Sequence, residues 1–267
     1  WPDHFGHELR RWIRRNDPSP IRTLSLFSGG GGLDIGFHDA GFEILEMVEV
    51  EKKFAASLEL NCGPGGYLEG SKVKCIDIRD YTPDESVIVD FIVGGPPCQT
   101  FSAAGRRTSG VKGTTDPRGM LFKEYVRLLE TLRPMGFLFE NVYGITGAEG
   151  GKAWSRIKKD FKDAGYLIKW RVLDAADFGV PQHRERVFIV GVRADISSEF
   201  RFPRPTHGPD SPHEVPFYTS GEAVDGLSSS VAENLSINGR WSSLIASIPP
   251  GLNYSFFTKE MGHPAPV

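Results

Sequence analysis

The sequence predicts an α/β fold with a mostly parallel sheet of seven strands and helices on both faces. Between residues 21 and 193, short apolar runs typical of buried strands alternate with stretches of helical periodicity. The first run leads into a glycine turn that opens a helix. After Arg193 the alternation stops, and nine of the 19 prolines lie between Phe202 and Val267. We therefore expect a basic N-terminal helix or arm at 1–20, a catalytic domain at 21–193, and a loop-rich extension at 194–267.

The individual elements follow from periodicity and from Gly and Pro breaks. Residues 120–132 place Leu121, Tyr125, Leu128, Leu129 and Leu132 on one face, which predicts an amphipathic helix. Other helices are expected from residue 33, at 54–61 and at about 150–164. Strands are expected at 23–27, 42–50, 74–78, 86–93, 135–139, 167–173 and 187–192.

Composition excludes several classes of protein. The 267 residues are 39% hydrophobic and 24% charged with a net charge of −3, so no global charge indicates a nucleic-acid partner. No apolar run approaches the length of a membrane span. Cys62, Cys75 and Cys98 show no C-x-x-C spacing, which argues against a disulfide framework and fits a reducing cytoplasm. We expect no metal site.

A glycine turn follows the first expected strand. Ser28 precedes four glycines, Gly29 to Gly32, which let the backbone approach a ligand closely. The dinucleotide pattern G-x-G-x-x-G fits in no register, and no Walker lysine is present, which speaks against NAD and phosphate-bearing ligands. Glu49 ends the second strand 20 positions beyond Gly29, where a carboxylate can accept hydrogen bonds from ribose hydroxyls. A surface glutamate is the alternative.

The fourth expected strand leads into a stiff loop that carries Cys98. Pro96 and Pro97 precede the cysteine at the end of a core strand, where α/β proteins place reactive groups. A buried, inert thiol is the alternative. From Gly105 to Lys123, five Lys and Arg residues face one acid, Asp116, so this stretch is either a solvated loop or a lid whose arginines meet phosphates.

Four motifs occur in order: Phe27-Ser28-Gly29-Gly30-Gly31-Gly32, Pro96-Pro97-Cys98-Gln99, Glu140-Asn141-Val142 and Gln182-His183-Arg184-Glu185-Arg186. Together they resemble the DNA (cytosine-5)-methyltransferases. The resemblance implies a Rossmann-like fold, S-adenosyl-L-methionine as cofactor with S-adenosyl-L-homocysteine as product, and methylation of cytosine carbon 5 in double-stranded DNA (EC 2.1.1.37 class).

The resemblance also assigns roles to residues. Cys98 resembles the nucleophile, Glu140 the acid that engages the base, and Arg184 and Arg186 the basic pair of the active site. The residues that resemble the cofactor site are Phe27, Ser28, Gly29, Gly31, Gly32, Leu33, Glu49, Val50, Asp77, Ile78, Pro97 and Leu121. Those expected at the DNA are Gln99, Ser102, Arg106, Arg107, Arg118 and Gln182.

The chemistry explains why these groups are needed. Carbon 5 of cytosine is a poor nucleophile, and addition of a thiolate at carbon 6 makes it enamine-like. A free thiol has a pKa of about 8.5, so we expect the basic pair to lower the pKa of Cys98. We expect burial to raise the pKa of Glu140, because the protonated acid can donate to ring nitrogen 3. The target base must flip out of the duplex.

Two alternatives stay open at this point. A cysteine hydrolase would pair Cys98 with His183 but leaves the glycine turn unexplained. A catalytically silent subunit of a restriction-modification system would bind cofactor and DNA only. No target-recognition region or late cofactor motif follows in the sequence. We expect a fragment or one subunit of a split enzyme, weakly active alone, with a second polypeptide and a cognate restriction endonuclease as partners in a prokaryotic cytoplasm at the nucleoid. We expect the residues that read the recognised DNA sequence to lie outside this chain.

Overall fold

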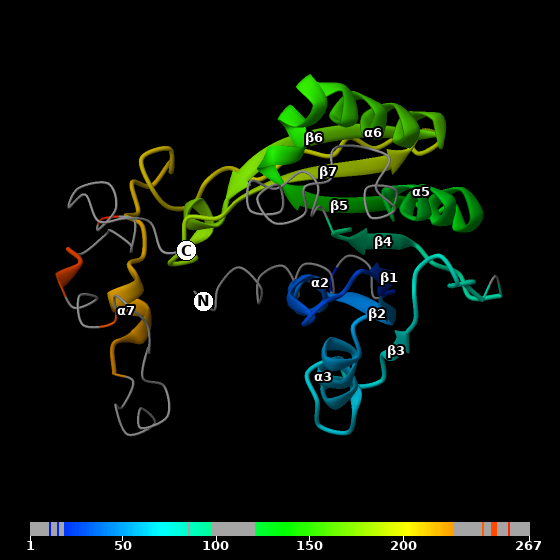
Figure 1. Cartoon of the computed structure of the whole chain (residues 1–267), viewed down its shortest axis with the longest axis horizontal. Helices are drawn as coiled ribbons and strands as arrows, with labels where there is room; N and C mark the ends of the chain where they lie inside the picture. Colours follow the sequence, from blue (N-terminus) through cyan, green and yellow to red (C-terminus); the bar gives the residue numbers. More distant parts are fainter. Residues whose placement is uncertain are drawn as a thin grey trace.

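A seven-stranded sheet forms the centre of the molecule, in the order β3-β2-β1-β4-β5-β7-β6 (Figure 1). The structure is a computed structural model that describes residues 19–84, 86–97 and 121–226, with 11, 15, 242, 247–249 and 256 as isolated positions. β7 runs antiparallel to β5 and β6, and the other pairings are parallel, so the sheet is mostly parallel as predicted. The strands are β1 (Ile21–Leu26), β2 (Phe42–Glu49), β3 (Lys72–Cys75), β4 (Phe91–Gly94), β5 (Gly136–Val142), β6 (Tyr166–Asp174) and β7 (Glu185–Arg193).

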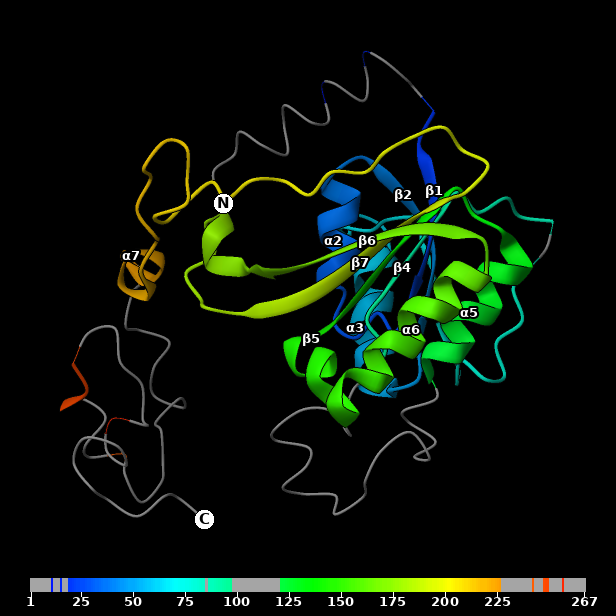
Figure 2. The same cartoon turned by 90° about the horizontal axis from the view of Figure 1, so that it is seen from above.

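Helices pack on both faces of the sheet. Neighbouring residues of a strand point to opposite faces. Met47 of β2 belongs to a hydrophobic cluster with Leu58 of α3, whereas the adjacent Val48 belongs to the main cluster with Tyr125 of α5 and Phe161 of α6. Figure 2 shows α5 and α6 side by side over one part of the sheet. The helices are α2 (Gly32–Asp39), α3 (Lys52–Cys62), α5 (Leu121–Leu132), α6 (Lys152–Asp163) and α7 (Ser220–Val224), with 3-10 helices η1 (Tyr143–Gly151) and η2 (Ala175–Phe178).

The fourth strand is shorter than predicted. It begins at Phe91 rather than at residue 86, and Val87 and Ile88 are exposed. Phe91 pairs with Thr23 of β1 on one side and with Gly136, the first residue of β5, on the other. β5 therefore begins level with Phe91, and β1 begins only two residues earlier, so Val87 and Ile88 have no neighbouring strand to pair with.

The chain returns toward the sheet after β7. The Ala194 N–H donates to the carbonyl of Gly165, and Lys169 of β6 binds Glu199. Further on, the N–H groups of Thr206 and His207 both donate to the carbonyl of Asp177 in η2. Most of the predicted N-terminal arm and most of the stretch after 226 lie outside the described residues. Within the described part of the chain, no helix is long and apolar enough to cross a membrane.

Candidate active site

The chain reverses its winding between β1 and β4, which are neighbours in the sheet although β2 and β3 come between them in sequence. Ligands of α/β sheets bind at such a point, beyond the carboxyl ends of the strands. A cavity of about 470 Å³ lies there. Eight of the twelve residues predicted to bind the cofactor line it: Phe27, Gly29, Glu49, Val50, Asp77, Ile78, Pro97 and Leu121.

The four other predicted residues shape the turn beside the cavity. Gly31 has a φ of +86°, in the region that favours glycine, and a Cβ there would lie 2.9 Å from Cδ2 of Leu58. Gly31 therefore allows both the turn and the close packing of α3. The Ser28 hydroxyl is 2.9 Å from the hydroxyl of Ser25 on β1. Gly32 and Leu33 are the first residues of α2.

Two backbone N–H groups fix the carboxylate of Glu49. Its Oε2 accepts from the N–H of Gly29 at 2.7 Å, and its Oε1 accepts from the N–H of Glu51 at 2.8 Å. The residue is 8% exposed and lines the cavity. Each carboxylate oxygen has two lone pairs, so capacity remains for the hydroxyls of a ribose. The geometry fits the predicted ribose-binding role, which stays a prediction.

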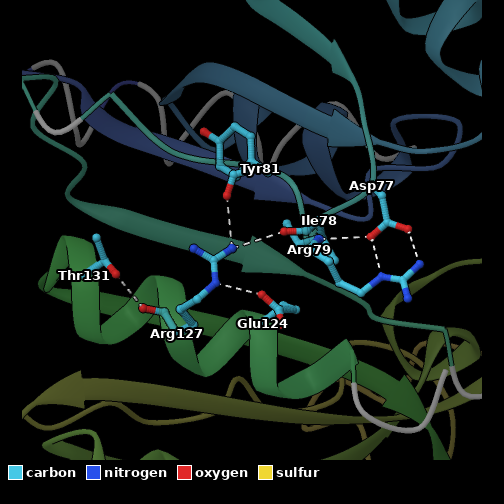
Figure 3. Close-up of polar contacts among 7 residues, drawn as sticks. All are labelled: Asp77, Ile78, Arg79, Tyr81, Glu124, Arg127 and Thr131. Atoms are coloured by element: carbon cyan, nitrogen blue, oxygen red, sulfur yellow. Dashed lines mark hydrogen bonds and ion pairs between the residues drawn. The ribbon is translucent and has the colours of Figure 1, made fainter. Parts of the chain in front are cut away.

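Asp77 is held by Arg79, which is not among the predicted site residues. Arg79 donates from Nε to Oδ1 at 2.9 Å and from Nη2 to Oδ2 at 2.6 Å (Figure 3). These hydrogen bonds lower the pKa of Asp77 to about 2. Arg79 itself lines the cavity, as does Phe54, whose ring is half exposed. The acid and base two positions apart after the third strand were the available signal for Arg79, whereas nothing in the sequence distinguished Phe54.

Glu140 and Arg186 form an ion pair near the carboxyl end of β5, with Nε 3.0 Å from Oε1. Arg186 lies opposite Val142 on the antiparallel strand β7, so it is a diagonal neighbour of Glu140 on the same face. Burial raises the pKa of Glu140, and the guanidinium groups of Arg186 and Arg184 oppose this without cancelling it. The direction is the one predicted.

Gly95 connects this ion pair to the cavity. It follows β4, it lines the cavity, and a Cβ at this position would lie 2.7 Å from Oε2 of Glu140. The absence of a side chain here leaves room for the carboxyl group. Since Pro97 lines the same cavity, the short segment that leads to Cys98 both lines the cavity and lies close to Glu140.

Asn141 holds this segment in place. Its Nδ2 donates to the carbonyl of Pro96 at 3.0 Å, and its Oδ1 accepts from the N–H of Val142 at 2.9 Å. The residue is 4% exposed. A buried amide bound to a loop carbonyl fixes the backbone two residues before Cys98. Asn141 belongs to one of the sequence motifs, but the sequence does not indicate its role, because the contact joins residues 45 positions apart.

Asp174, at the end of β6, orders the turn that carries the basic pair. Its Oδ1 accepts from the N–H of Arg184 at 2.7 Å, and its Oδ2 lies 2.8 Å from Nδ1 of His183. His183 and Gln182 are exposed. The remaining predicted residues lie outside the described part of the chain: Cys98, Gln99, Ser102, Arg106, Arg107 and Arg118.

Comparison with known proteins identifies what the chain resembles. M.FnuDI of Fusobacterium nucleatum, a type II methyltransferase, is 45% identical over 188 residues, which is 69% of this chain and 51% of that protein. M.AquIA of Picosynechococcus sp., also a type II methyltransferase, is 42% identical over 200 residues, 71% of this chain and 78% of that protein. The chain thus spans about half the length of M.FnuDI and more of M.AquIA.

Solved structures share the fold. A crystal structure assigned to a prophage-encoded DNA modification methyltransferase (E. coli) superimposes with a TM-score of 0.59 at 29% identity, covering 78% of this chain and 55% of that one. The Dnmt2 methyltransferase of S. pombe gives a TM-score of 0.52 at 20% identity, over 68% and 52% of the two chains, and supports the fold alone. The family model described as C-5 cytosine-specific DNA methylase matches residues 21–249. The chain belongs to the C-5 cytosine-specific DNA methylase family.

Proposed function

We propose that this chain is the catalytic part of a DNA (cytosine-5)-methyltransferase that methylates cytosine in double-stranded DNA through base flipping and a covalent adduct with Cys98. The observation that carries the proposal is the segment from Gly95 to Pro97. It lines the cavity beyond the carboxyl ends of β1 and β4 and also contacts Glu140, whose carboxyl group pairs with Arg186. Cofactor and target base would thereby meet at the cysteine that follows.

The methylases of this family use S-adenosyl-L-methionine, which supplies an electrophilic methyl group when bound. The residues around the cavity fit such a molecule. The carboxylate of Glu49 can accept from ribose hydroxyls, and the apolar side chains of Val50, Phe54 and Ile78 can cover a flat base. Among the described residues that line the cavity there is no lysine, and the one arginine, Arg79, is paired with Asp77, which fits a cofactor without phosphates.

The protein's own residues then have distinct tasks. Cys98, as thiolate, forms a bond to carbon 6 of the flipped cytosine, and the electron pair of the carbon 5–carbon 6 double bond is displaced into the ring. Glu140, protonated, donates to ring nitrogen 3 and stabilises the charge that develops there. Arg186 holds the carbonyl oxygen of the base. Once carbon 5 carries the methyl group, it loses its proton. This loss restores the carbon 5–carbon 6 double bond and expels the sulfur of Cys98.

Duplex DNA is the proposed substrate, with Gln99, Ser102, Arg106, Arg107, Arg118 and Gln182 as contacts. We also propose a partner polypeptide that carries a target-recognition region, and a cognate restriction endonuclease. Relatives of different length belong to the family, since similar shares of this chain cover 78% of M.AquIA and 51% of M.FnuDI. Residues 21–193 would form the catalytic domain. We propose that it acts in the cytoplasm at the nucleoid, because its proposed substrate is DNA.

The test is the identity of the methylated base. The chain is incubated with duplex DNA and S-adenosyl-L-methionine, alone and with the C-terminal region of M.FnuDI supplied separately, and the DNA is digested and analysed by mass spectrometry. We expect 5-methylcytosine in the supplemented reaction, little from the chain alone, and none with Cys98→Ser. Methylation at an exocyclic amino group, or 5-methylcytosine from the Ser variant, contradicts the proposal. Cofactor binding without any methylation favours the alternative of a silent subunit.

A further inference from the structure

Arg127 of α5 contacts the turn that carries three of the cavity residues, Asp77, Ile78 and Arg79. One nitrogen of its guanidinium, Nη2, donates to the carbonyl of Ile78 at 3.1 Å and to the carbonyl of Tyr81 at 3.0 Å (Figure 3). Its Nε donates to Glu124 at 2.7 Å. Arg127 is 49 positions from Ile78 in sequence, so these bonds join α5 to a distant loop.

The turn at 77–81 has little regular structure of its own. The Asp80 N–H donates to the carbonyl of Asp77 at 2.9 Å, and the Tyr81 N–H reaches the carbonyl of Ile78 at 3.3 Å. The Tyr81 hydroxyl donates to Glu46 of β2 at 2.6 Å. β2 therefore holds one end of the turn, and Arg127 holds its carbonyls from the side of α5.

The helix that carries Arg127 is packed into the core by four buried side chains. Phe122, Tyr125, Leu128 and Leu129 fix α5 in the main hydrophobic cluster. Leu121, the first residue of α5, lines the cavity together with Asp77 and Ile78. One helix thus supplies a cavity residue directly and, through Arg127, binds the backbone of another, Ile78.

We propose that Arg127 is a positioning residue for the cofactor: it holds the turn at 77–81 in the form that lines the cavity. Arg127 does not line the cavity itself, so its effect passes through the carbonyls that it binds. This inference rests on the proposed function, because it assigns the cavity to S-adenosyl-L-methionine. It adds a residue outside the cavity to those that set cofactor affinity.

The test compares Arg127→Met with a matched control. Met keeps the apolar stem and removes every donor. Arg22 is the control, because its guanidinium makes a comparable double contact, to Asp90, and is similarly exposed at 36% against 39%. Arg22 and Asp90 lie at the opposite end of the strands from the cavity, beside the first residues of β1 and β4. Arg22→Met therefore reports the cost of losing a paired guanidinium that does not support the cavity.

Binding of S-adenosyl-L-homocysteine is measured by calorimetry, and hydrogen exchange of the amides of Asp80 and Tyr81 is followed without ligand. We expect Arg127→Met to weaken binding roughly tenfold or more and to speed exchange at both amides, because two hydrogen bonds from a charged donor are lost. Arg127→Lys should recover part of the affinity, and Arg22→Met should leave affinity and exchange at the turn unchanged.

The outcomes separate the two proposals. If the wild-type chain does not bind S-adenosyl-L-homocysteine, either alone or with the C-terminal region of M.FnuDI, both the proposed function and this inference are contradicted. Wild-type binding that Arg127→Met leaves unchanged overturns the inference alone. Equal losses in Arg127→Met and Arg22→Met also overturn it, because they show a general effect on stability. Unchanged exchange at Asp80 and Tyr81 shows that Arg127 does not hold the turn.

Discussion

At the scale of single residues, the carboxyl group of Glu140 is subject to two opposing influences. Burial raises its pKa, and the nearby guanidinium groups of Arg186 and Arg184 lower it, with burial the larger effect. A raised pKa keeps a larger share of the acid protonated near neutral pH, which is the form that can donate to a ring nitrogen. The environment of this side chain therefore suits the role that we propose for it.

The raised pKa predicts how stability changes with pH. A group whose pKa is higher in the folded state stabilises the fold below its unfolded pKa, about 4.3 for Glu, and loses this contribution as pH rises through its folded pKa. We expect wild type to lose stability relative to Glu140→Gln as pH rises from 4 to 7, in urea unfolding at a series of pH values. The pKa direction is contradicted if the difference in unfolding free energy between the two proteins stays constant. It is also contradicted if wild type gains stability relative to Glu140→Gln as pH rises.

The Asn141 contact predicts a loss of stability. Asn141→Ala leaves the carbonyl of Pro96 without its donor in a buried place, which should cost about 1–3 kcal/mol in the free energy of unfolding. The control is Asn61→Ala, which removes a solvent-exposed hydrogen bond from the amide to the carbonyl of Ser57 within helix α3 and should cost no more than about 0.5 kcal/mol. Equal losses of unfolding free energy in the two variants would show that the buried contact with Pro96 stabilises the fold no more than an exposed hydrogen bond does.

At the scale of elements, the site depends on how closely the end of β4 approaches the end of β5. Gly94 pairs with Phe139, and the next residues on each strand, Gly95 and Glu140, lie in contact. The carboxyl group can lie over the chain only because residue 95 has no side chain. The ladder of the sheet thus determines the distance between the loop that leads to the nucleophile and the acid.

Gly95→Ala should separate activity from stability. The added methyl group would lie 2.7 Å from Oε2 of Glu140, the far end of a flexible side chain, so the acid can move while the fold persists. We expect at least a tenfold loss of methylation activity, with a change in unfolding free energy within about 1 kcal/mol. Gly63→Ala, whose Cβ would meet no atom closer than 3.7 Å, should leave activity unchanged. Full activity in Gly95→Ala would show that Glu140 does not need the space left by the absent side chain at residue 95.

The sequence predicted the elements better than the contacts between them. Strand and helix periodicity predicted seven strands and α5, although β3 runs from Lys72 to Cys75 and not from 74 to 78. The predicted cofactor residues Gly29 and Glu49 both line the cavity. The predicted start of β4 was wrong, because where this strand begins depends on where β1 and β5 begin and not on its own residues. Asn141, Gly95 and Arg127 were missed for the same reason: each acts through a partner about 45 or more positions away.

At the scale of the whole molecule, the strand order brings the parts of the site together. The chain builds β1, β2 and β3 outward on one side and then β4, β5, β7 and β6 on the other, so the carboxyl ends of β1 and β4 meet at the centre. The first half supplies Glu49 and the glycine turn, and the second supplies Glu140 and Arg186. The loop that leads to Cys98 leaves the sheet where the halves join.

The central claim is that Cys98 forms a covalent bond to the target base, and trapping tests it most directly. Duplex DNA carrying 5-fluorocytosine is incubated with the chain, the C-terminal region of M.FnuDI and S-adenosyl-L-methionine, because a fluorine at carbon 5 blocks the last proton loss. We predict a protein–DNA adduct that survives denaturation and maps by peptide mass spectrometry to Cys98, and that is absent in Cys98→Ser. An adduct at another residue, or methylated cytosine formed by the Ser variant, would contradict the account.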